Sequence, residues 1–178
     1  MREKVAWVTD STGFLDEELQ RNEHLHVVPI QLHMEGKDYL DSINITNEEM
    51  FQAMSERGAV VTTSQPSVGQ FQQLYERLEN EGYERIYAFL LSGQLSGTVS
   101  SSKQAAQLVN IPVYTFDTML LSYPLTYIMK KAMALFEKGY SPNEILEQAA
   151  VFRDSNEAYV LIGSLDQLHK SGRLSSVK

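Results

Sequence analysis

The stretch Tyr87–Ser102, YAFLLSGQLSGTVSSS, contains the change of pattern that decides the fold. Its apolar start predicts a buried strand, and the glycines and serines that follow predict a tight loop that opens a helix at Thr98. Free backbone N–H groups at such a helix start, with the hydroxyl group of Ser96 beside them, favour an anion. An ordinary loop with a serine cap fits the same spacing, so both interpretations stay open at this point.

Strand and helix patterns alternate around this stretch, from residue 60 to about residue 153. Such alternation predicts an α/β fold with a mostly parallel sheet and helices on both faces. Ligands of such sheets bind at the carboxyl ends of the strands, where we expect the polar loops 9–13, 63–67 and 92–97 to meet. The expected strands are 4–8, 60–63, 85–91 and 112–116, with a hairpin over 27–40; the expected helices are 15–21, 46–57, 67–80, 98–109, 119–138 and 141–153.

The composition changes after residue 156, where a further strand over 158–163 and a short helix over 165–170 are expected. These two elements are too short to form a hydrophobic core of their own. We therefore expect residues 1–155 to form one α/β domain, and residues 156–178 to be the beginning of a second α/β domain that is incomplete in this chain.

The composition excludes several classes of function. The formal net charge is −8 and no basic run occurs, so we expect no nucleic-acid partner. The longest apolar stretch, 119–136, contains a proline and two lysines, so we expect no integral membrane segment. The absence of cysteine removes thiolate chemistry and fits a cytoplasmic protein. No nucleotide-binding glycine motif occurs, and we expect no cofactor.

Ser96 also lies where the nucleophile of a serine hydrolase would lie, on a strand-to-helix turn. The pattern around it is GxxSG rather than GxSxG, and nothing in the sequence brings His169 or Asp117 near it. We therefore expect no enzyme and no catalytic residue, although a hydrolase that acts on acyl esters through Ser96 remains the alternative hypothesis. A purely structural or regulatory domain is a third hypothesis.

Metal binding is not expected either, because the four histidines, at positions 24, 26, 33 and 169, lack the spacing of a ligand set. We expect Asp10 and Asp117, each at a strand end, to cap helices rather than to bind a cation. The helix expected over 119–138 is apolar on most sides, which is typical of a buried helix. The alternative for that helix is one wall of an apolar tunnel.

Several motifs occur in an order that resembles the DegV family of bacterial fatty-acid-binding proteins. The pair TSQPS and LSGT, separated by a helix and a strand, is the most specific part of this similarity. The similarity spans the whole chain and rests on TDST (9–12), VPI (28–30), residues 36–41, TSQPS (63–67), LSGT (95–98), Asp117 and KSGR (170–173).

This resemblance implies a two-domain α/β protein that holds one long-chain, palmitate-like fatty acid between its domains. It implies that Thr63 and Ser96 bind the carboxylate, and that Ser64, Gly97 and Thr98 belong to the ligand loops. It also favours the tunnel interpretation for the helix over 119–138. A role in lipid transport or fatty-acid metabolism follows from the same resemblance.

Some members of the family present the fatty acid to a separate ATP-binding kinase subunit, and Arg173 matches a surface arginine linked to that partner. The chain departs from the family in three respects. It has Val99 and Tyr123 where an aromatic and a small residue are expected, and it ends about a hundred residues earlier. We therefore leave the preferred acyl length open and expect weaker binding if the second domain is missing.

Overall fold

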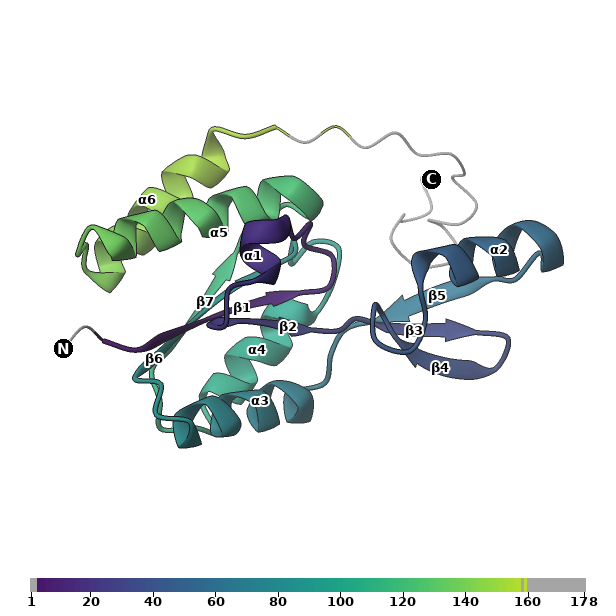
Figure 1. Ribbon diagram of the computed structural model, residues 1–178, viewed down its shortest axis with the longest axis horizontal. Helices are drawn as coiled ribbons and strands as arrows, with labels where there is room; N and C mark the ends of the chain where they lie inside the picture. The colour runs from purple at the N-terminus through teal and green to yellow at the C-terminus, as the bar shows by residue number, and fades with distance from the viewer. Residues whose placement is uncertain (1–2, 158, 160–178) are drawn as a thin grey trace, which may run out of the picture.

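The computed structural model describes residues 3–157 and 159 and divides them into two lobes (Figure 1). The larger lobe contains a four-stranded parallel sheet in the order β2-β1-β6-β7. The smaller lobe contains a three-stranded antiparallel sheet in the order β4-β3-β5. The predicted α/β class with a mostly parallel sheet is therefore confirmed. The parallel strands are β1 (Val5–Asp10), β2 (Leu25–Val28), β6 (Arg85–Leu90) and β7 (Val113–Asp117).

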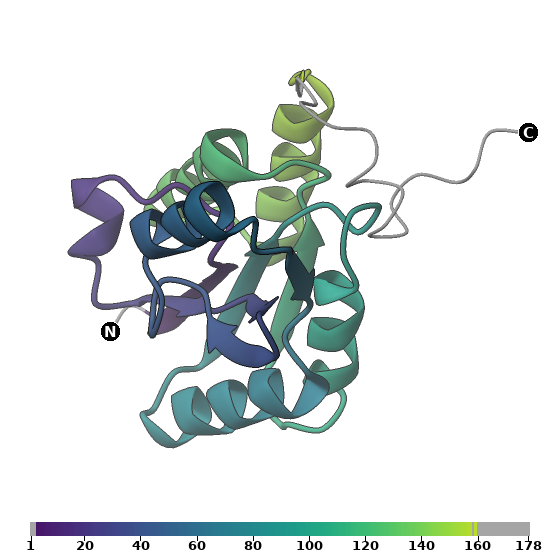
Figure 2. The same ribbon diagram turned by 90° about the vertical axis from the view of Figure 1, so that its right-hand side faces the viewer.

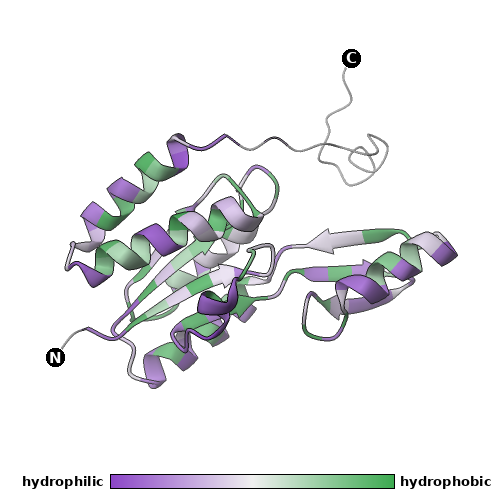
Figure 3. Cartoon of the chain, turned by 45° about the horizontal axis from the view of Figure 1, so that its top comes forward, coloured by the Kyte–Doolittle hydropathy of each residue, from purple (hydrophilic) through white to green (hydrophobic). Residues whose placement is uncertain are grey.

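Helices cover both faces of the parallel sheet, as predicted (Figures 1 and 3). Every residue of β1 is buried, because successive side chains pack against opposite layers of helices. Val8 and Ala88 belong to one core, and Trp7 and Phe89 belong to the other. The first core lies under α3 (Val68–Asn80) and α4 (Thr98–Ala106); the second lies under α5 (Ser122–Glu137), α6 (Pro142–Asp154) and the short α1 (Glu17–Gln20).

Three helices begin at the capping boxes that the sequence predicts. The side chains of Thr46, Ser67 and Ser141 each accept a hydrogen bond from the backbone of the residue three positions on, and that residue's side chain accepts one in return. Helix α5 begins at Ser122, three residues after the expected start at 119, and Pro124 lies in its first turn, where a proline is tolerated.

The predicted hairpin over 27–40 is corrected, because its first strand belongs to two different sheets. Strand β2 ends at Val28, and β3 (Gln31–Met34) begins after Pro29 in the antiparallel sheet. Proline has no N–H group to extend the parallel ladder, and the N–H group of Ile30 donates to Ser11 Oγ over 3.0 Å. The turn into β4 (Lys37–Leu40) lies at Glu35 and Gly36, as predicted.

The strand predicted at 60–63 is also corrected, since it is not part of the parallel sheet. Strand β5 (Val61–Ser64) pairs antiparallel with β3 in the small sheet, whose side of the molecule faces the viewer in Figure 2. In the register of this pair, Thr63 lies opposite Leu32. Helix α2 (Asn47–Arg57) covers one face of this small sheet through Ala53. A short β-branched run suits either sheet, so the sequence could not place this strand.

The strand and helix expected at 158–163 and 165–170 lie outside the described residues, and the domain boundaries stay a prediction. Among the residues that are described, no helix is both long enough and apolar enough to cross a membrane.

A buried polar network joins α3, α4 and β7. The hydroxyl groups of Tyr75 and Ser102 lie 2.7 Å apart, and those of Ser102 and Thr115 are also separated by 2.7 Å. Tyr75 and Ser102 are fully buried. Burial raises the pKa of the Tyr75 hydroxyl group, and the hydrogen bond with Ser102 opposes this effect.

We predict that Tyr75→Phe lowers the free energy of unfolding by about 1–2 kcal/mol, because Ser102 loses a buried partner. Tyr140→Phe is the matched control, since Tyr140 is exposed, and it should change stability by less than about 0.5 kcal/mol. Urea unfolding of both variants measures the difference. Equal stability of the two variants would contradict the network's role.

Candidate functional site

The carboxyl edge of the parallel sheet is held together by the buried side chain of Asp10. One carboxylate oxygen accepts the backbone N–H of Leu91 over 2.8 Å. The other accepts the N–H and the hydroxyl group of Thr12, over 3.0 and 2.5 Å. Burial raises the pKa of Asp10, and the hydrogen bonds from Thr12 and Leu91 oppose this rise. Asp10 thus joins the loops after β1 and β6 and caps no helix, contrary to expectation.

Asp117 has the matching role at the end of β7. Its carboxylate accepts the N–H of Gly93 over 3.1 and 3.2 Å and the N–H of Met119 over 2.9 Å. A Cβ atom on Gly93 would lie 2.7 Å from Asp117 Oδ2, so this loop requires glycine for the close approach. Asp117 therefore fixes the loop after β6, instead of capping a helix as expected.

The loop 92–97 folds back on itself and opens α4, as the sequence predicts. The carbonyl oxygen of Ser92 accepts the N–H groups of Leu95 and Ser96, over 3.0 and 3.2 Å. The hydroxyl group of Ser96 lies 2.8 Å from that of Thr98, the first residue of α4, and accepts the Thr98 N–H over 3.4 Å. A groove of about 380 Å³ runs from Ser96 along the outer side of α4 to Lys103.

The loop 63–67 lies against the Ser96 loop, although it comes from the other lobe. A Cβ atom on Gly97 would lie 3.0 Å from Gln65 Nε2 and 3.1 Å from Gln65 Cδ. Thr63 is exposed and Ser96 is half-buried. The structure therefore places the two predicted ligand loops side by side, with Gln65 and Gly97 at their contact.

Apolar side chains accompany these loops. Ile30, Leu91 and Leu125 form a small buried cluster, which Leu121 joins. Further large apolar side chains on the loops after β1, β6 and β7 are about half exposed: Phe14 (55%), Leu95 (43%) and Met119 (47%), together with Tyr123 (57%) in the first turn of α5. The edge of the sheet thus offers hydroxyl groups and exposed apolar surface together.

Only the start of α5 takes part in this apolar edge. Further along the helix, Ile128, Met129 and Ala132 are fully buried in the core under the sheet. Most of the apolar surface of this helix therefore packs in the core, which is the buried-helix interpretation, and does not form a tunnel wall.

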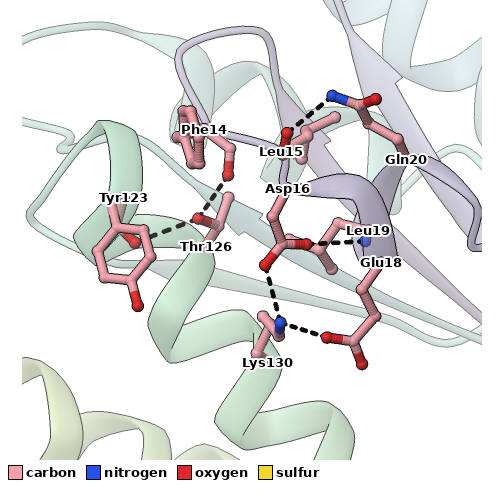
Figure 4. Close-up of polar contacts among 9 residues, drawn as sticks. All are labelled: Phe14, Leu15, Asp16, Glu18, Leu19, Gln20, Tyr123, Thr126 and Lys130. Atoms are coloured by element: carbon pink, nitrogen blue, oxygen red, sulfur yellow. Dashed lines mark hydrogen bonds and ion pairs between the residues drawn. The ribbon is translucent and has the colours of Figure 1, made fainter.

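The loop after β1 is anchored to α5 by polar contacts (Figure 4). The hydroxyl group of Thr126 donates to the carbonyl oxygen of Phe14 over 2.8 Å. Lys130 pairs with Asp16, over 2.9 Å, and with Glu18. Asp16 also accepts the N–H of Leu19, and this hydrogen bond, followed by that from Lys130, lowers the pKa of Asp16. The two carboxylates raise the pKa of Lys130.

Two of the described histidines pack against Tyr83. His26 in β2 and His24 just before this strand both contact the ring of Tyr83 edge-on. Burial lowers the pKa of His26. No group of three or more acidic or histidine side chains suited to a metal ion occurs in the part of the chain that the structure describes.

The serine-hydrolase alternative is not supported. The hydroxyl group of Ser96 is bonded to Thr98, and the carboxylate of Asp117 is bonded to two backbone N–H groups. His169 and the predicted partner-contact residue Arg173 lie outside the described residues.

Three features of the site were missed by sequence reasoning. Asp10 was noticed as a strand-end acid, but its bond to Leu91 spans 81 residues of chain and left no sequence signal. Gln65 belongs to the TSQPS motif, but only Thr63 and Ser64 of this motif were expected to take part in the site, and the contact of Gln65 with Gly97 was not predicted. Ser64 was expected in a ligand loop, but its hydroxyl group bonds Gln31 and His33 over 3.1 and 2.8 Å.

Comparisons with known proteins agree with this geometry. A family model described as "Uncharacterised protein, DegV family" matches residues 4–178. A DegV domain-containing protein of Staphylococcus aureus (strain N315) is 39% identical over 175 residues, which are 98% of this chain and 62% of that protein. The chain therefore spans less than two thirds of the length of this relative.

Two solved structures are similar to this chain. The first is described as "Fatty Acid Binding of a DegV family Protein from Thermus thermophilus". It is 35% identical to this chain with a TM-score of 0.76, and the match covers 85% of this chain and 54% of the Thermus thermophilus chain. The second, DegV of Bacillus subtilis, is described as a fatty acid binding protein. It is 30% identical to this chain with a TM-score of 0.89, and the match covers 98% of this chain and 62% of the Bacillus subtilis chain.

We predict that Gly93→Ala lowers the free energy of unfolding by about 1–3 kcal/mol, because the added methyl group displaces the carboxylate of Asp117 from its N–H partners. Gly69→Ala is the matched control. Gly69 lies inside α3 with only Ser67 Oγ near its added Cβ, at 3.9 Å, so this change should stabilise the fold by about 0.5–1 kcal/mol. Thermal and urea unfolding measure both changes, and effects of the same sign would contradict the close approach.

Proposed function

Since this chain belongs to the DegV family, we propose that it binds one long-chain, palmitate-like fatty acid and holds the carboxylate with the hydroxyl groups of Thr63 and Ser96. The observation that carries this proposal is the packing of Gln65 against Gly97, which joins the two loops that bear these hydroxyl groups. The fatty-acid binding described for the relatives of Thermus thermophilus and Bacillus subtilis supports it.

A fatty acid makes two physical demands on a binding site. Each methylene group removed from water contributes about 0.8 kcal/mol, so the acyl chain supplies most of the affinity. The carboxylate needs hydrogen-bond donors, because a buried anion without partners is costly. Hydroxyl groups and the N-terminal N–H groups of α4 can provide these donors, and they fix which end of the ligand lies at the loops.

The proposed role is binding without catalysis. The proposed contacts offer an anion hydrogen-bond donors, and Ser96 lacks a bonded base among the described residues. Such a site protects and orients a fatty acid for lipid transport or fatty-acid metabolism. We also propose that residues 156–178 begin a second α/β domain that closes over the ligand.

We infer a separate partner, an ATP-binding fatty-acid kinase subunit, as the consumer of the bound carboxylate. In that reaction a carboxylate oxygen attacks the γ-phosphorus of ATP, an acyl phosphate forms, and ADP leaves. Binding through neutral donors supports this role, since it leaves the carboxylate oxygens nucleophilic. The absence of cysteine fits the cytoplasm, where ATP is available.

We predict that the double variant Thr63→Ala, Ser96→Ala weakens fatty-acid binding by about tenfold or more, because the carboxylate loses two donors. The control is Thr62→Ala, Ser100→Ala, which removes the same groups from exposed neighbouring positions. Displacement of a fluorescent fatty acid measures affinity, and native mass spectrometry before and after delipidation identifies the bound species.

Equal palmitate affinity in the two double variants would contradict the assigned contacts. Absence of bound lipid in the purified wild-type chain, together with no uptake of added palmitate, would contradict the proposed function itself. Labelling of Ser96 by a fluorophosphonate, with cleavage of acyl esters, would instead support a hydrolase.

We predict that Arg173→Ala reduces the rate of acyl-phosphate formation with the kinase subunit by about fivefold or more, because a cation at a docking surface speeds association. Fatty-acid affinity should stay unchanged in this variant. Arg21→Ala serves as the control, since Arg21 is exposed and pairs within α1. A normal rate in Arg173→Ala would exclude this residue as a partner contact.

A further inference from the structure

The outer face of the small sheet carries a chain of polar contacts that runs across all three strands. Asp38 on β4 lies 2.6 Å from His33 Nδ1, and His33 Nε2 lies 2.8 Å from Ser64 Oγ on β5. Leu32 and Met34, on either side of His33, pack under α2, so His33 points to the opposite face. These distances match those of a Ser-His-Asp catalytic triad.

In a catalytic triad the serine hydroxyl group donates its proton to the histidine. The contacts of Ser64 indicate the opposite direction, with the histidine as donor to the serine. At the far end of the chain, the backbone N–H of Ser67 donates to Gln70 Oε1 over 2.8 Å within the capping box of α3. This bond identifies the oxygen of the Gln70 amide, which also accepts from Gln31 Nε2 over 3.2 Å. The amide oxygen of Gln31 must then face Ser64, at 3.1 Å.

The orientation of Gln31 decides the protonation of His33. An amide oxygen only accepts, so Ser64 donates its one hydroxyl proton to Gln31. Ser64 Oγ can then only accept from His33 Nε2. The carboxylate of Asp38 also only accepts, so His33 Nδ1 carries a proton as well. This arrangement requires both ring nitrogens of His33 to act as donors.

We propose that doubly protonated His33 is a positioning residue that holds Ser64, and through it the loop that carries Thr63, in the geometry needed for the carboxylate. The effect on lipid binding rests on the proposed function, whereas the protonation of His33 does not. Ser64 cannot act as a nucleophile here, since His33 has no lone pair to accept its proton.

Loss of one proton from His33 would break this chain. Neutral His33, still donating to Asp38, would present a lone pair to Ser64, and Ser64 would have to turn its proton away from Gln31. Ser64 Oγ and the amide oxygen of Gln31 would then face each other without a proton between them. Turning the amides of Gln31 and Gln70 would relieve this contact, but it would disrupt the capping box at Ser67. The chain of contacts therefore requires a proton on each ring nitrogen of His33.

Charged groups around His33 agree with a positive ring. On β4, Asp38 is the charged partner in contact with it. On β5, its described partner Ser64 carries no charge, and neither do Gln31 and Gln70, which follow Ser64 in the chain of contacts. Within the turn before β4, Glu35 pairs with Arg57 of α2, so that carboxylate is already neutralised.

Nuclear magnetic resonance of ¹⁵N-labelled histidine tests the protonation without any lipid. We expect both ring nitrogens of His33 to give the signals of N–H groups in the wild-type chain. In Gln31→Met, Ser64 is free to donate to His33, so the N–H signal of Nε2 should weaken relative to the wild type under the same conditions. Gln73→Met is the control, since Gln73 is an exposed glutamine of α3. A wild-type His33 with a single N–H group, or no change in Gln31→Met, would overturn the proposal.

Hydrogen exchange and lipid affinity test the positioning role. His33→Leu should speed amide exchange in 63–67 and weaken fatty-acid binding by about three- to tenfold, as expected for one lost charged hydrogen bond. His33→Gln keeps an N–H donor toward Ser64 and should restore much of both properties. Unchanged exchange in His33→Leu would overturn the proposal. A wild-type chain that binds no lipid while His33 is doubly protonated would contradict only the proposed function.

Discussion

The buried carboxylate of Asp10 holds the ends of two adjacent parallel strands at one point, and the loops at that edge of the sheet are arranged around it. Its hydrogen bond to Leu91 fixes where β6 gives way to the Ser96 loop, and its bonds to Thr12 fix the loop after β1. Asp117 repeats this arrangement from β7 by binding Gly93. Backbone donors that would otherwise be unpaired at buried strand ends are thereby satisfied.

The second lobe depends on Pro29. Because proline ends the ladder of β2, the chain leaves the parallel sheet and builds β3, β4, α2 and β5 before it returns at Ser64. The antiparallel direction of β5 brings its carboxyl end back to the larger lobe, where Gln65 meets Gly97. The two hydroxyl-bearing loops therefore meet because of a break in a strand, and their spacing depends on how the two lobes are held relative to each other.

Local patterns in the sequence predicted local structure well, and they failed where long-range pairing decides. The capping boxes at Thr46, Ser67 and Ser141 each contain all of their partners within three residues, so they could be recognised. The placement of 61–64 depends on its partner β3, some thirty residues away, and a four-residue strand contains too little pattern to choose between two sheets. The importance of Gln65 was equally invisible, because its contact with Gly97 joins two lobes.

The charges around the candidate site suggest why an anion would be held there by neutral donors. Lys130 is already paired with Asp16 and Glu18, and Arg153 is paired with Asp154 and directed at the carbonyl oxygen of Asp117. These two cations stabilise the scaffold, whereas Lys103 lines the groove beside Ser96. A carboxylate bound by hydroxyl and N–H dipoles keeps more of its negative charge than one in an ion pair. Such a site can bind an acyl chain tightly through apolar burial and still leave its headgroup reactive, which is what a carrier that passes its ligand to another protein requires.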